Sequence, residues 1–567
     1  MSSEMASKRI AEEVLPVNRE NKRARIPAQD ADADAGHAGI SASNLRDDAT
    51  VDVLEKLEGY AEDGETPASS STGTKKKKNP RTRKQPESNQ KKVGRRRRGT
   101  RNQEDADREA AGEERETSKA PRYPKRQCAL LVGFCGSGYS GMQIQPDHTK
   151  TIEGVLFKAL VKAGAVSQDN ADDPVKVNLA RAARTDAGVH AAGNVVSLKM
   201  IMDVPGVNNL TERINEELPP EIRLWGYVRT QNSFNARLVC DSRKYTYFFP
   251  SYLLIPPKPG SGLYRALQQH ATQSQDPDSS ETKPTLSEAF WTGIDSLSAR
   301  EEDLLRKREW RVRPDQLEKL RNTALKFEGT HNFHNFTVGR EFSDRSNHRF
   351  MKKIEIGDPV VYGGTEWISV LFHGQSFMLH QVRKMMSALV LSCRCDTPEQ
   401  IIDELYGPRD VFIPKMPALG LLLEEPLFHS YNGRMATVSE KFQSTDNDYR
   451  PPIDFDIYRK EINAFKEVFI YKNMREVENR DGIFDAWIRA LDAYAGNDLL
   501  YLGNAGTIPT LSIIKKGERR DNPFKEKKIF DATSFPVSDN AKKTLAEEEE
   551  SEEEAPVSKK HLAEMEG

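Results

Sequence analysis

Apolar positions along the chain follow two periodicities, which predict a body of alternating strands and helices. Apolar runs and alternating patterns predict strands at residues 128–134, 175–180, 194–200, 222–229, 243–249 and 367–374. Apolar residues three and four apart predict helices at 151–164, 210–218 and 375–393, and a helical patch between 461 and 496. This alternation is typical of an α/β or α+β fold.

Two of these segments carry further signals. Glycines 136, 138 and 141 follow the first strand and should end it in a tight loop. In the predicted helix at 375–393, Met378, Val382, Met385 and Leu389 form one apolar face, and Arg383 lies outside that face. In the strand at 243–249, Tyr245 and Tyr247 should point to the same side of the sheet.

The periodicity is weak at both ends of the 567-residue chain, and charge is segregated there. Residues 75–101 contain 14 Lys and Arg against Glu87, whereas residues 541–567 contain nine Glu against four Lys. Neither end can bury a core, so both are expected to be disordered. The basic run is typical of a nuclear localisation signal and of polyanion binding, with a solvated arm as the alternative.

These shifts in composition suggest six regions. They are a disordered basic N-terminal arm (1–121), a first ordered region (122–255), an insertion or linker (256–312), a second ordered region (313–435), a C-terminal helical extension (436–539) and an acidic disordered tail (540–567). Residues 256–286 are rich in Pro, Gly, Ser and Gln and are expected to form a loop.

Several classes of protein are disfavoured by the sequence. The N-terminus carries acidic residues and has no apolar core like that of a signal peptide, and no apolar run approaches the length of a membrane span. Five cysteines in 567 residues make a disulfide framework improbable. Cys393 and Cys395, with His331 and His334, are weak candidates for a Zn²⁺ site, against the alternative of buried thiols and surface imidazoles.

Three separated segments carry candidate chemistry: "RTDAGVHA" (184–191), "FNARLVCDSRKYTY" (234–247) and "SFMLHQVRKM" (376–385). Taken singly, Asp186 could be a turn residue, Tyr245 a core residue and Arg383 a solvated helix residue. Together with "GFCGSGYSGMQIQ" near residue 133, the segments resemble the tRNA pseudouridine synthase A (TruA-type) family, in particular its eukaryotic branch as found in fungi. The resemblance covers about residues 125 to 435.

The resemblance implies an N-terminal catalytic half (122–255) and a C-terminal catalytic half (313–435). These are two related α/β halves joined into one mixed, mainly antiparallel sheet with a central basic cleft. It places the family's catalytic aspartate on Asp186 as nucleophile, its active-site tyrosine on Tyr245 and its arginine partner on Arg383. Arg184 matches the arginine that this family inserts into RNA. Six further basic residues in or beside the motifs are candidate phosphate contacts: Arg181, Lys199, Arg237, Arg243, Lys244 and Lys384.

The implied reaction converts uridine to pseudouridine by moving the ribose bond from N1 to C5 of the base. It is redox-neutral and needs no external group, so no cofactor is expected, with Zn²⁺ kept only as the weak possibility above. A carboxylate suits this chemistry, because it can attack the electron-poor C1′ or add to C6 of the ring, and arginine would keep it ionised and oriented. The target base must be flipped out of its stack, at a cost of a few kcal/mol.

By resemblance, the expected substrates are tRNA and pre-tRNA at positions 27 and 28 and, in intron-containing precursors, 34 to 36. U2 small nuclear RNA and some messenger RNAs are expected as well. We expect a nuclear protein without a membrane partner, acting as a monomer because the helices near 461–496 could cover the surface through which bacterial relatives dimerise. The alternatives are a noncatalytic RNA-binding or tRNA-chaperone protein on a synthase scaffold, and a zinc-dependent RNA module.

Overall fold

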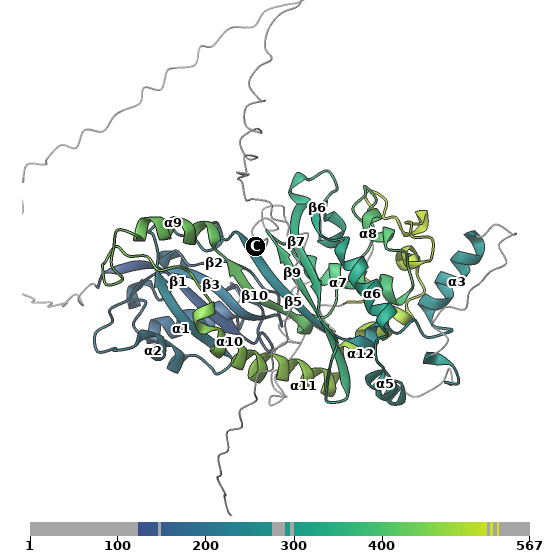
Figure 1. Ribbon diagram of the computed structural model, residues 1–567, viewed down its shortest axis with the longest axis horizontal. Coiled ribbons are helices and arrows are strands. Elements are labelled where there is room, and N and C mark those ends of the chain that lie inside the picture. The colour runs from purple at the N-terminus through teal and green to yellow at the C-terminus, as the bar shows by residue number, and fades with distance from the viewer. Residues whose placement is uncertain are drawn as a thin grey trace, which may run out of the picture. The chain divides into compact units, whose positions relative to one another are not determined.

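The strand segments pair into one ten-stranded sheet in the computed structural model (Figure 1). The structure describes residues 123–145, 149–274, 290–294, 300–518, 522–525 and 530–531. The disordered tails predicted at 1–121 and 540–567 lie outside the described residues. The strands are β1 (Lys125–Phe134), β2 (Ala180–Arg181), β3 (His190–Ile201), β4 (Ile222–Arg229), β5 (Ser242–Pro250), β6 (Gly329–Asn332), β7 (His348–Ile356), β8 (Val360–Tyr362), β9 (Thr365–Gly374) and β10 (Leu421–Leu427).

The strand order explains how distant segments of the chain meet. The sheet runs β4-β1-β3-β10-β5-β9-β7-β6, with β2 added beside β3 and β8 beside β9. Among the described strands, every pairing is antiparallel except that of β10 with β3, where Leu422 lies opposite His190. The predicted mixed, mainly antiparallel sheet is therefore confirmed, and β10 separates β3 from β5 at its centre.

Helices pack at both ends of this sheet. In Figure 1, α1 and α2 lie beside β1 and β3, whereas α6, α7 and α8 lie at the other end, near β7 and β9. The helices are α1 (Ile152–Lys162), α2 (Leu210–Glu217), α3 (Gly262–Ser274), α5 (Arg300–Glu309), α6 (Pro314–Leu325), α7 (Gln381–Arg394), α8 (Gln400–Glu404), α9 (His429–Ser439), α10 (Arg459–Phe465), α11 (Lys472–Asp481) and α12 (Ile483–Ala493). No helix in the described ranges is long and apolar enough to cross a membrane.

Most predicted elements are present, and α1 shows why. The Thr151 side chain accepts a hydrogen bond from Gly154 N and caps the helix, and Gly164 follows it with a φ of +80°. The helical patch predicted between 461 and 496 is also confirmed, as α10, α11 and α12. A six-residue π-helix (Lys466–Tyr471) joins α10 to α11.

Two predictions from local pattern are wrong. Residues 175–180 form mostly a 3-10 turn (Pro174–Val177), because the Asp173 side chain caps Val175 N at 2.8 Å and Asn178 adopts a left-handed φ of 54°. Only the end of the predicted strand remains, as the two-residue β2. The apolar alternation is misleading here, because Val177 is buried whereas Val175 is 74% exposed.

The segment at 256–286 was expected to be a loop, but it contains α3. Leu263 is buried and Leu267 packs partly against the core, four positions further on. Their helical spacing places both on the side of α3 that contacts α12. Packing against α12 and the helix-forming Ala, Gln and Arg of this segment outweigh the loop-like composition of its flanks.

The C-terminal extension covers part of the sheet and contacts both of its halves. Phe465 at the end of α10 packs edge-on against Trp225 of β4, with ring centroids 5.4 Å apart. Tyr471, at the end of the π-helix, packs against Phe248 of β5 at 4.9 Å. The extension therefore bridges β4 and β5, which lie on opposite sides of β3 and β10 in the sheet.

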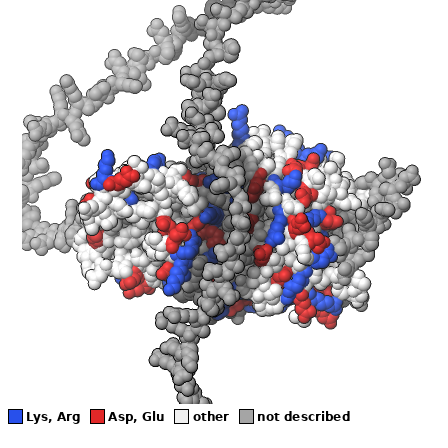
Figure 2. All heavy atoms as spheres, viewed as in Figure 1, with Lys and Arg blue, Asp and Glu red and all other residues white. Residues whose placement is uncertain are grey.

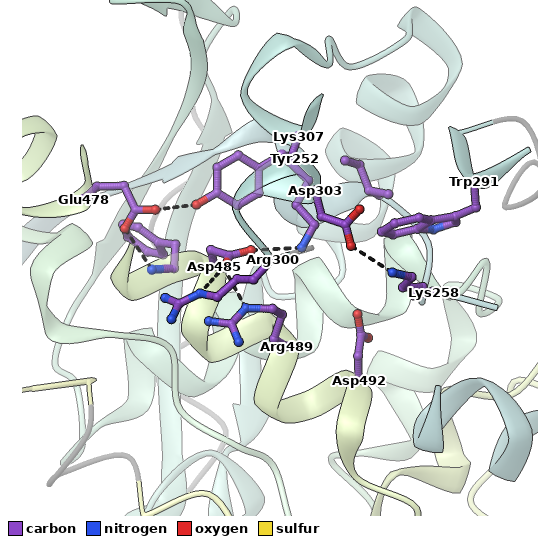
Figure 3. A network of polar contacts seen from close by, with 12 residues as sticks. Tyr252, Lys258, Trp291, Arg300, Asp303, Lys307, Glu478, Asp485, Arg489 and Asp492 are labelled. Carbon is purple, nitrogen blue, oxygen red and sulfur yellow. Dashed lines mark hydrogen bonds and ion pairs between the residues drawn. The ribbon is translucent and has the colours of Figure 1, made fainter. Parts of the chain in front are cut away.

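A buried polar network holds the extension against α5 (Figure 3). The Asp485 carboxylate of α12 forms ion pairs with Lys307 Nζ of α5 at 2.9 Å and with Arg489 Nε at 2.7 Å. The side chains of Asp485 and Lys307 are almost fully buried. In the same view, Glu478 of α11 accepts a hydrogen bond from the hydroxyl of Tyr252. Buried charges that are paired in this way disfavour other placements of α11 and α12.

Glu478 makes this attachment pH-dependent. Burial raises the pKa of its carboxyl from 4.5 to about 7, against the lowering effect of hydrogen bonds from Tyr252 and from Phe484 N. An acid with a raised pKa binds its proton more tightly in the folded state than in the unfolded state. Its contribution to stability is complete below pH 4.5 and is lost as the pH rises through 7.

We therefore expect Glu478→Gln to lose less stability than the wild type between pH 5 and pH 8. The two proteins should differ in this loss of unfolding free energy by about 3 kcal/mol at most. The difference can be measured from the change of Tm with pH. Glu476→Gln, at an exposed position of the same helix, is the matched control and should follow the wild type. Parallel curves for all three proteins would contradict this account of Glu478.

Candidate active site

The aspartate loop lies between β2 and β3 and is held by the glycine-rich segment that follows β1. Met142 N donates to Thr185 O at 3.1 Å, and Gly188 N donates to Tyr139 O at 3.3 Å. Gly141 has a φ of +88°, and a Cβ atom there would lie 2.9 Å from Thr185 O. A glycine at this position therefore allows the two loops to approach closely.

Two buried polar side chains fix the ends of the loop. Asn194 of β3 accepts a hydrogen bond from Ala183 N at 3.2 Å and donates to Ala183 O at 2.9 Å. His190 Nδ1 accepts from Gly136 N at 3.0 Å, so its Nε2 carries the proton and donates to Leu419 O at 3.2 Å. Burial lowers the pKa of His190 to about 4, which keeps the ring neutral.

Asp186 faces the first turn of α7. Arg383 Nη1 lies 3.4 Å from Asp186 Oδ2, and His380 Nε2 lies 3.5 Å from the same oxygen. The Arg383 side chain is fully buried, whereas that of Asp186 is 27% exposed. One side of the carboxylate is therefore held by a buried cation while the other remains accessible.

Arg383 is fully buried, which rules out the alternative of a solvated helix residue. Its Nε donates to Met416 O at 2.6 Å, and its terminal nitrogens contact Asp186 and Asp531. Burial disfavours the charge, but these two carboxylates raise the pKa of Arg383. The helix is therefore covered on its polar side as well as on its apolar side.

Tyr245 lies on β5, beside the aspartate loop. Its ring packs edge-on against Phe377 with centroids 5.1 Å apart, and burial raises the pKa of its hydroxyl, which keeps it neutral. Tyr247, two residues along the strand, points to the same side and donates to Pro417 O at 2.6 Å. The shared face predicted for the two tyrosines is therefore confirmed.

The three sequence segments meet in one pocket. Its lining comprises Arg184, Thr185, Asp186 and Val189 from the aspartate loop, Arg243 and Tyr245 from β5, residues 377–383 from α7 and the turn before it, and Leu421 from β10. The strand order explains this meeting, because β10 is the neighbour of both β3 and β5 and β9 leads into α7. The structure thus brings together Asp186, Tyr245, Arg383 and Arg184.

Two of the candidate RNA contacts make internal bonds instead. Arg243 is buried and donates to Ala182 O at 2.8 Å and to Gln375 O at 3.1 Å, which joins the aspartate loop to the segment before α7. Arg181 pairs with Glu153, whose side chain is fully buried. Both arginines support the geometry of the pocket.

The two lysine candidates beside the pocket are also engaged within the protein. Lys244 pairs with Glu425 at 2.9 Å and keeps about a third of its side chain exposed. Lys384 donates to Thr337 O at 2.7 Å.

Lys199 is exposed, and Arg237 and Arg184 are half-buried. On the face shown in Figure 2, basic and acidic side chains are interspersed over the described surface. The basic cleft and the individual RNA contacts therefore stay predictions.

The candidate zinc residues do not form a site. No cluster of three or more His, Cys, Asp or Glu that could hold a metal occurs among the described residues. Burial raises the pKa of Cys393 and of Cys395 to about 12, and the Cys393 thiol donates to Thr323 Oγ1. His331 stacks on Tyr406, and His334 is a buried residue rather than a surface imidazole.

Sequence reasoning missed three residues that shape the site: His190, His380 and Asp531. His190 and His380 stand inside the quoted motifs, so their positions beside Asp186 and Arg383 could have suggested them. His380 also has a left-handed φ of 60° at the start of α7, a strained conformation that is common at functional sites. Asp531 had no such signal, because it lies far from every motif.

Comparison with known proteins defines the class to which this site belongs. A family model described as tRNA pseudouridine synthase matches residues 323–429. The chain is 40% identical to tRNA pseudouridine synthase 1 of Eremothecium gossypii over 425 residues, which are 69% of this chain and 78% of the relative. It is 41% identical to the Saccharomyces cerevisiae protein of that name, over 66% of this chain and 73% of the relative. For the Schizosaccharomyces pombe protein of that name, the identity is 38%, over 68% and 86%.

These matches identify an isomerase that acts on uridine in RNA. The chain belongs to the tRNA pseudouridine synthase family, as its motifs suggested. The matches with these relatives cover 66–69% of the chain, so they extend well beyond the segment matched by the family model.

The close approach of the glycine-rich segment predicts different effects for two glycine substitutions. Gly141→Ala and Gly206→Ala each place a side chain at a positive φ, which costs about 1–2 kcal/mol. At Gly141 the new Cβ would also press on Thr185 O, whereas at Gly206 it would meet open space. Gly141→Ala should therefore reduce the rate of pseudouridine formation much more than Gly206→Ala in protein of equal folded content. Equal rates would show that the backbone contact does not hold the loop.

Proposed function

We propose that this protein isomerises uridine to pseudouridine in tRNA at the pocket around Asp186. The observation that carries the proposal is the contact between the accessible carboxylate of Asp186 and the fully buried guanidinium of Arg383. The N1 to C1′ bond breaks, the base turns, and a bond forms between C5 and C1′. The C5 proton is lost and N1 gains a proton, so the product is an isomer of the substrate.

Asp186 acts as the nucleophile in this scheme, and Arg383 keeps it ionised and oriented. The neutral Tyr245, buried beside Phe377, offers an aromatic edge and a hydroxyl to the flipped base. Arg184 lines the same pocket and fills the space that the base leaves in the RNA. These roles use four of the side chains that line the pocket, and they require no redox step or added group.

A noncatalytic RNA-binding role is not favoured. Such a protein would not need a buried arginine beside an accessible aspartate, because burying a charge costs several kcal/mol unless it is paired. The relatives that match this chain are also named as synthases, and the match covers most of their length.

For the substrates, we propose tRNA positions 27 and 28, positions 34 to 36 of intron-containing precursors, U2 small nuclear RNA and some messenger RNAs. The protein would act in the nucleus, where such precursors occur, and the basic run at 75–101 would direct it there. It would act as a monomer, which is supported by the packing of α10 and the π-helix over the sheet. Light scattering that gives twice the chain mass would contradict the monomer.

The role of Asp186 predicts a loss of chemistry without a loss of binding. Asp186→Asn keeps the size of the side chain but removes its charge, so tRNA affinity should persist while single-turnover formation of pseudouridine disappears. Asp203→Asn, at an exposed position after β3, is the control and should keep the wild-type rate. A near-normal rate in Asp186→Asn would make Asp186 a turn residue and remove the basis of the proposal.

The role of Arg383 predicts a change in pH dependence. Arg383→Met leaves the Asp186 carboxylate without its cation, so the carboxylate should bind a proton more readily. The remaining single-turnover rate should then rise with pH over a range where the wild type is already at its plateau. A uniformly lowered rate with an unchanged profile would argue against this role.

The proposed location and substrates can be tested together. Deleting residues 75–101 should move the protein to the cytoplasm and remove pseudouridine from intron-containing precursors and U2 small nuclear RNA, as mapped across the transcriptome. The pocket is untouched, so the purified deletion variant should keep its rate on a short tRNA stem-loop. A nuclear signal that persists would mean that another segment directs the protein.

A further inference from the structure

Arg383 has a second carboxylate partner, which comes from the C-terminal part of the chain. Asp531 Oδ2 lies 3.2 Å from Arg383 Nη1, and Asp531 Oδ1 accepts from Arg383 Nη2. The same carboxylate pairs with Lys415 Nζ at 3.0 Å and accepts from Ala418 N at 3.3 Å. Its side chain is only 5% exposed.

This arrangement fixes the plane of the Arg383 guanidinium. Asp531 binds both terminal nitrogens, Met416 O binds Nε, and only Nη1 also reaches Asp186. A carboxylate that contacts both terminal nitrogens defines the orientation of a guanidinium, which a single contact cannot do. Asp531 therefore determines the direction in which Nη1 points.

Asp531 also affects the charge that Asp186 experiences. Two cations, Arg383 and Lys415, face two carboxylates, Asp186 and Asp531. Burial raises the pKa of Asp531, but Arg383 and Lys415 outweigh that effect and lower it, so Asp531 is ionised. The Asp531 carboxylate thus partly neutralises the positive charge of Arg383, which weakens the attraction between Arg383 and Asp186.

We infer that Asp531 is a positioning residue of the isomerisation, which orients Arg383 and moderates the charge that Arg383 presents to Asp186. The inference rests on the proposed roles of Asp186 and Arg383. It places a determinant of the reaction outside the residues matched by the family model, 148 positions after Arg383. The C-terminal segment is then part of the catalytic apparatus as well as of the fold.

The same helix offers a matched control. Arg394, in the last turn of α7, is also buried, and it binds both oxygens of Asp492 at 2.7 and 3.1 Å. Its Nε donates to Ile255 O at 2.9 Å, as the Nε of Arg383 does to Met416 O. Arg394 does not line the pocket. Asp492→Asn therefore removes an equivalent buried pair without touching the site.

The test compares pH profiles of the single-turnover rate on one tRNA for full-length wild type, Asp531→Asn and Asp492→Asn. In Asp531→Asn, Arg383 acts on Asp186 without competition, so the acidic limb of the profile should move to lower pH. The weaker nucleophile and the freer guanidinium should lower the plateau rate about tenfold. Asp492→Asn should lower Tm but keep the position of the acidic limb.

The groups that face Asp186 and Asp531 are otherwise the same in these variants. His380, Tyr245 and Arg184 share the pocket with Asp186, and Tyr247 lies near Asp531. All of these groups are present in every variant, so a shift that is confined to Asp531→Asn reports the lost carboxylate. The shift should be opposite in direction to that of Arg383→Met.

The double variant Asp531→Asn with Lys415→Met removes one negative and one positive charge, so the net charge around Arg383 is that of the wild type. It replaces the single variant in the test if Asp531→Asn folds poorly. In this double variant the acidic limb should return towards the wild-type position. If Asp531→Asn or the double variant loses rate equally at all pH values, as a destabilised protein would, Asp531 is only structural and the inference is wrong. An active Asp186→Asn would instead overturn the proposed function itself, so the two failures are distinguishable.

Discussion

The burial of one positive charge is the constraint on which the centre of this structure depends. The Arg383 side chain has no exposed surface, and such a charge costs several kcal/mol unless it is paired and hydrogen-bonded. Its partners come from three distant parts of the chain: the aspartate loop, the turn at Met416 and the C-terminal Asp531. Satisfying this guanidinium therefore requires the aspartate loop, the central strands and the C-terminal segment to meet at one point.

The second determinant of the site is the immobility of its aspartate loop. Asn194 and His190 bind the loop ends through polar atoms that have no access to water, and Gly141 lets the neighbouring loop contact it through backbone atoms alone. The loop that carries Asp186 is thus held by neutral hydrogen bonds that do not titrate near neutral pH. A site of this kind has little reorganisation to undergo when the substrate arrives.

Local patterns predicted the elements well and the partners poorly. Strand β4 (Ile222–Arg229) and helix α1 follow from period and caps. The turn at Pro174–Val177 also has a local cause, the Asp173 cap, which the apolar alternation concealed, whereas α3 depends on packing against α12 that no local window contains. The motif residues Asp186, Tyr245 and Arg383 were found because a family resemblance joined them. Asp531 and the internal bonds of Arg243 and Lys384 could not be found, because ion pairs are set by three-dimensional neighbours rather than by spacing.

The parallel pairing of β10 with β3 also affects how the enzyme is made. It joins segments that are far apart in the chain, as the hydrogen bond between His190 and Leu419 across 229 positions shows. Contacts of such high sequence separation carry a large loop-closure entropy and form late in folding. On the ribosome, the aspartate loop is synthesised long before β10 and α7 emerge. A nascent chain therefore carries Asp186 without Arg383 while the next 197 residues are added, and the proposed site is complete only when Asp531 follows a further 148 positions on.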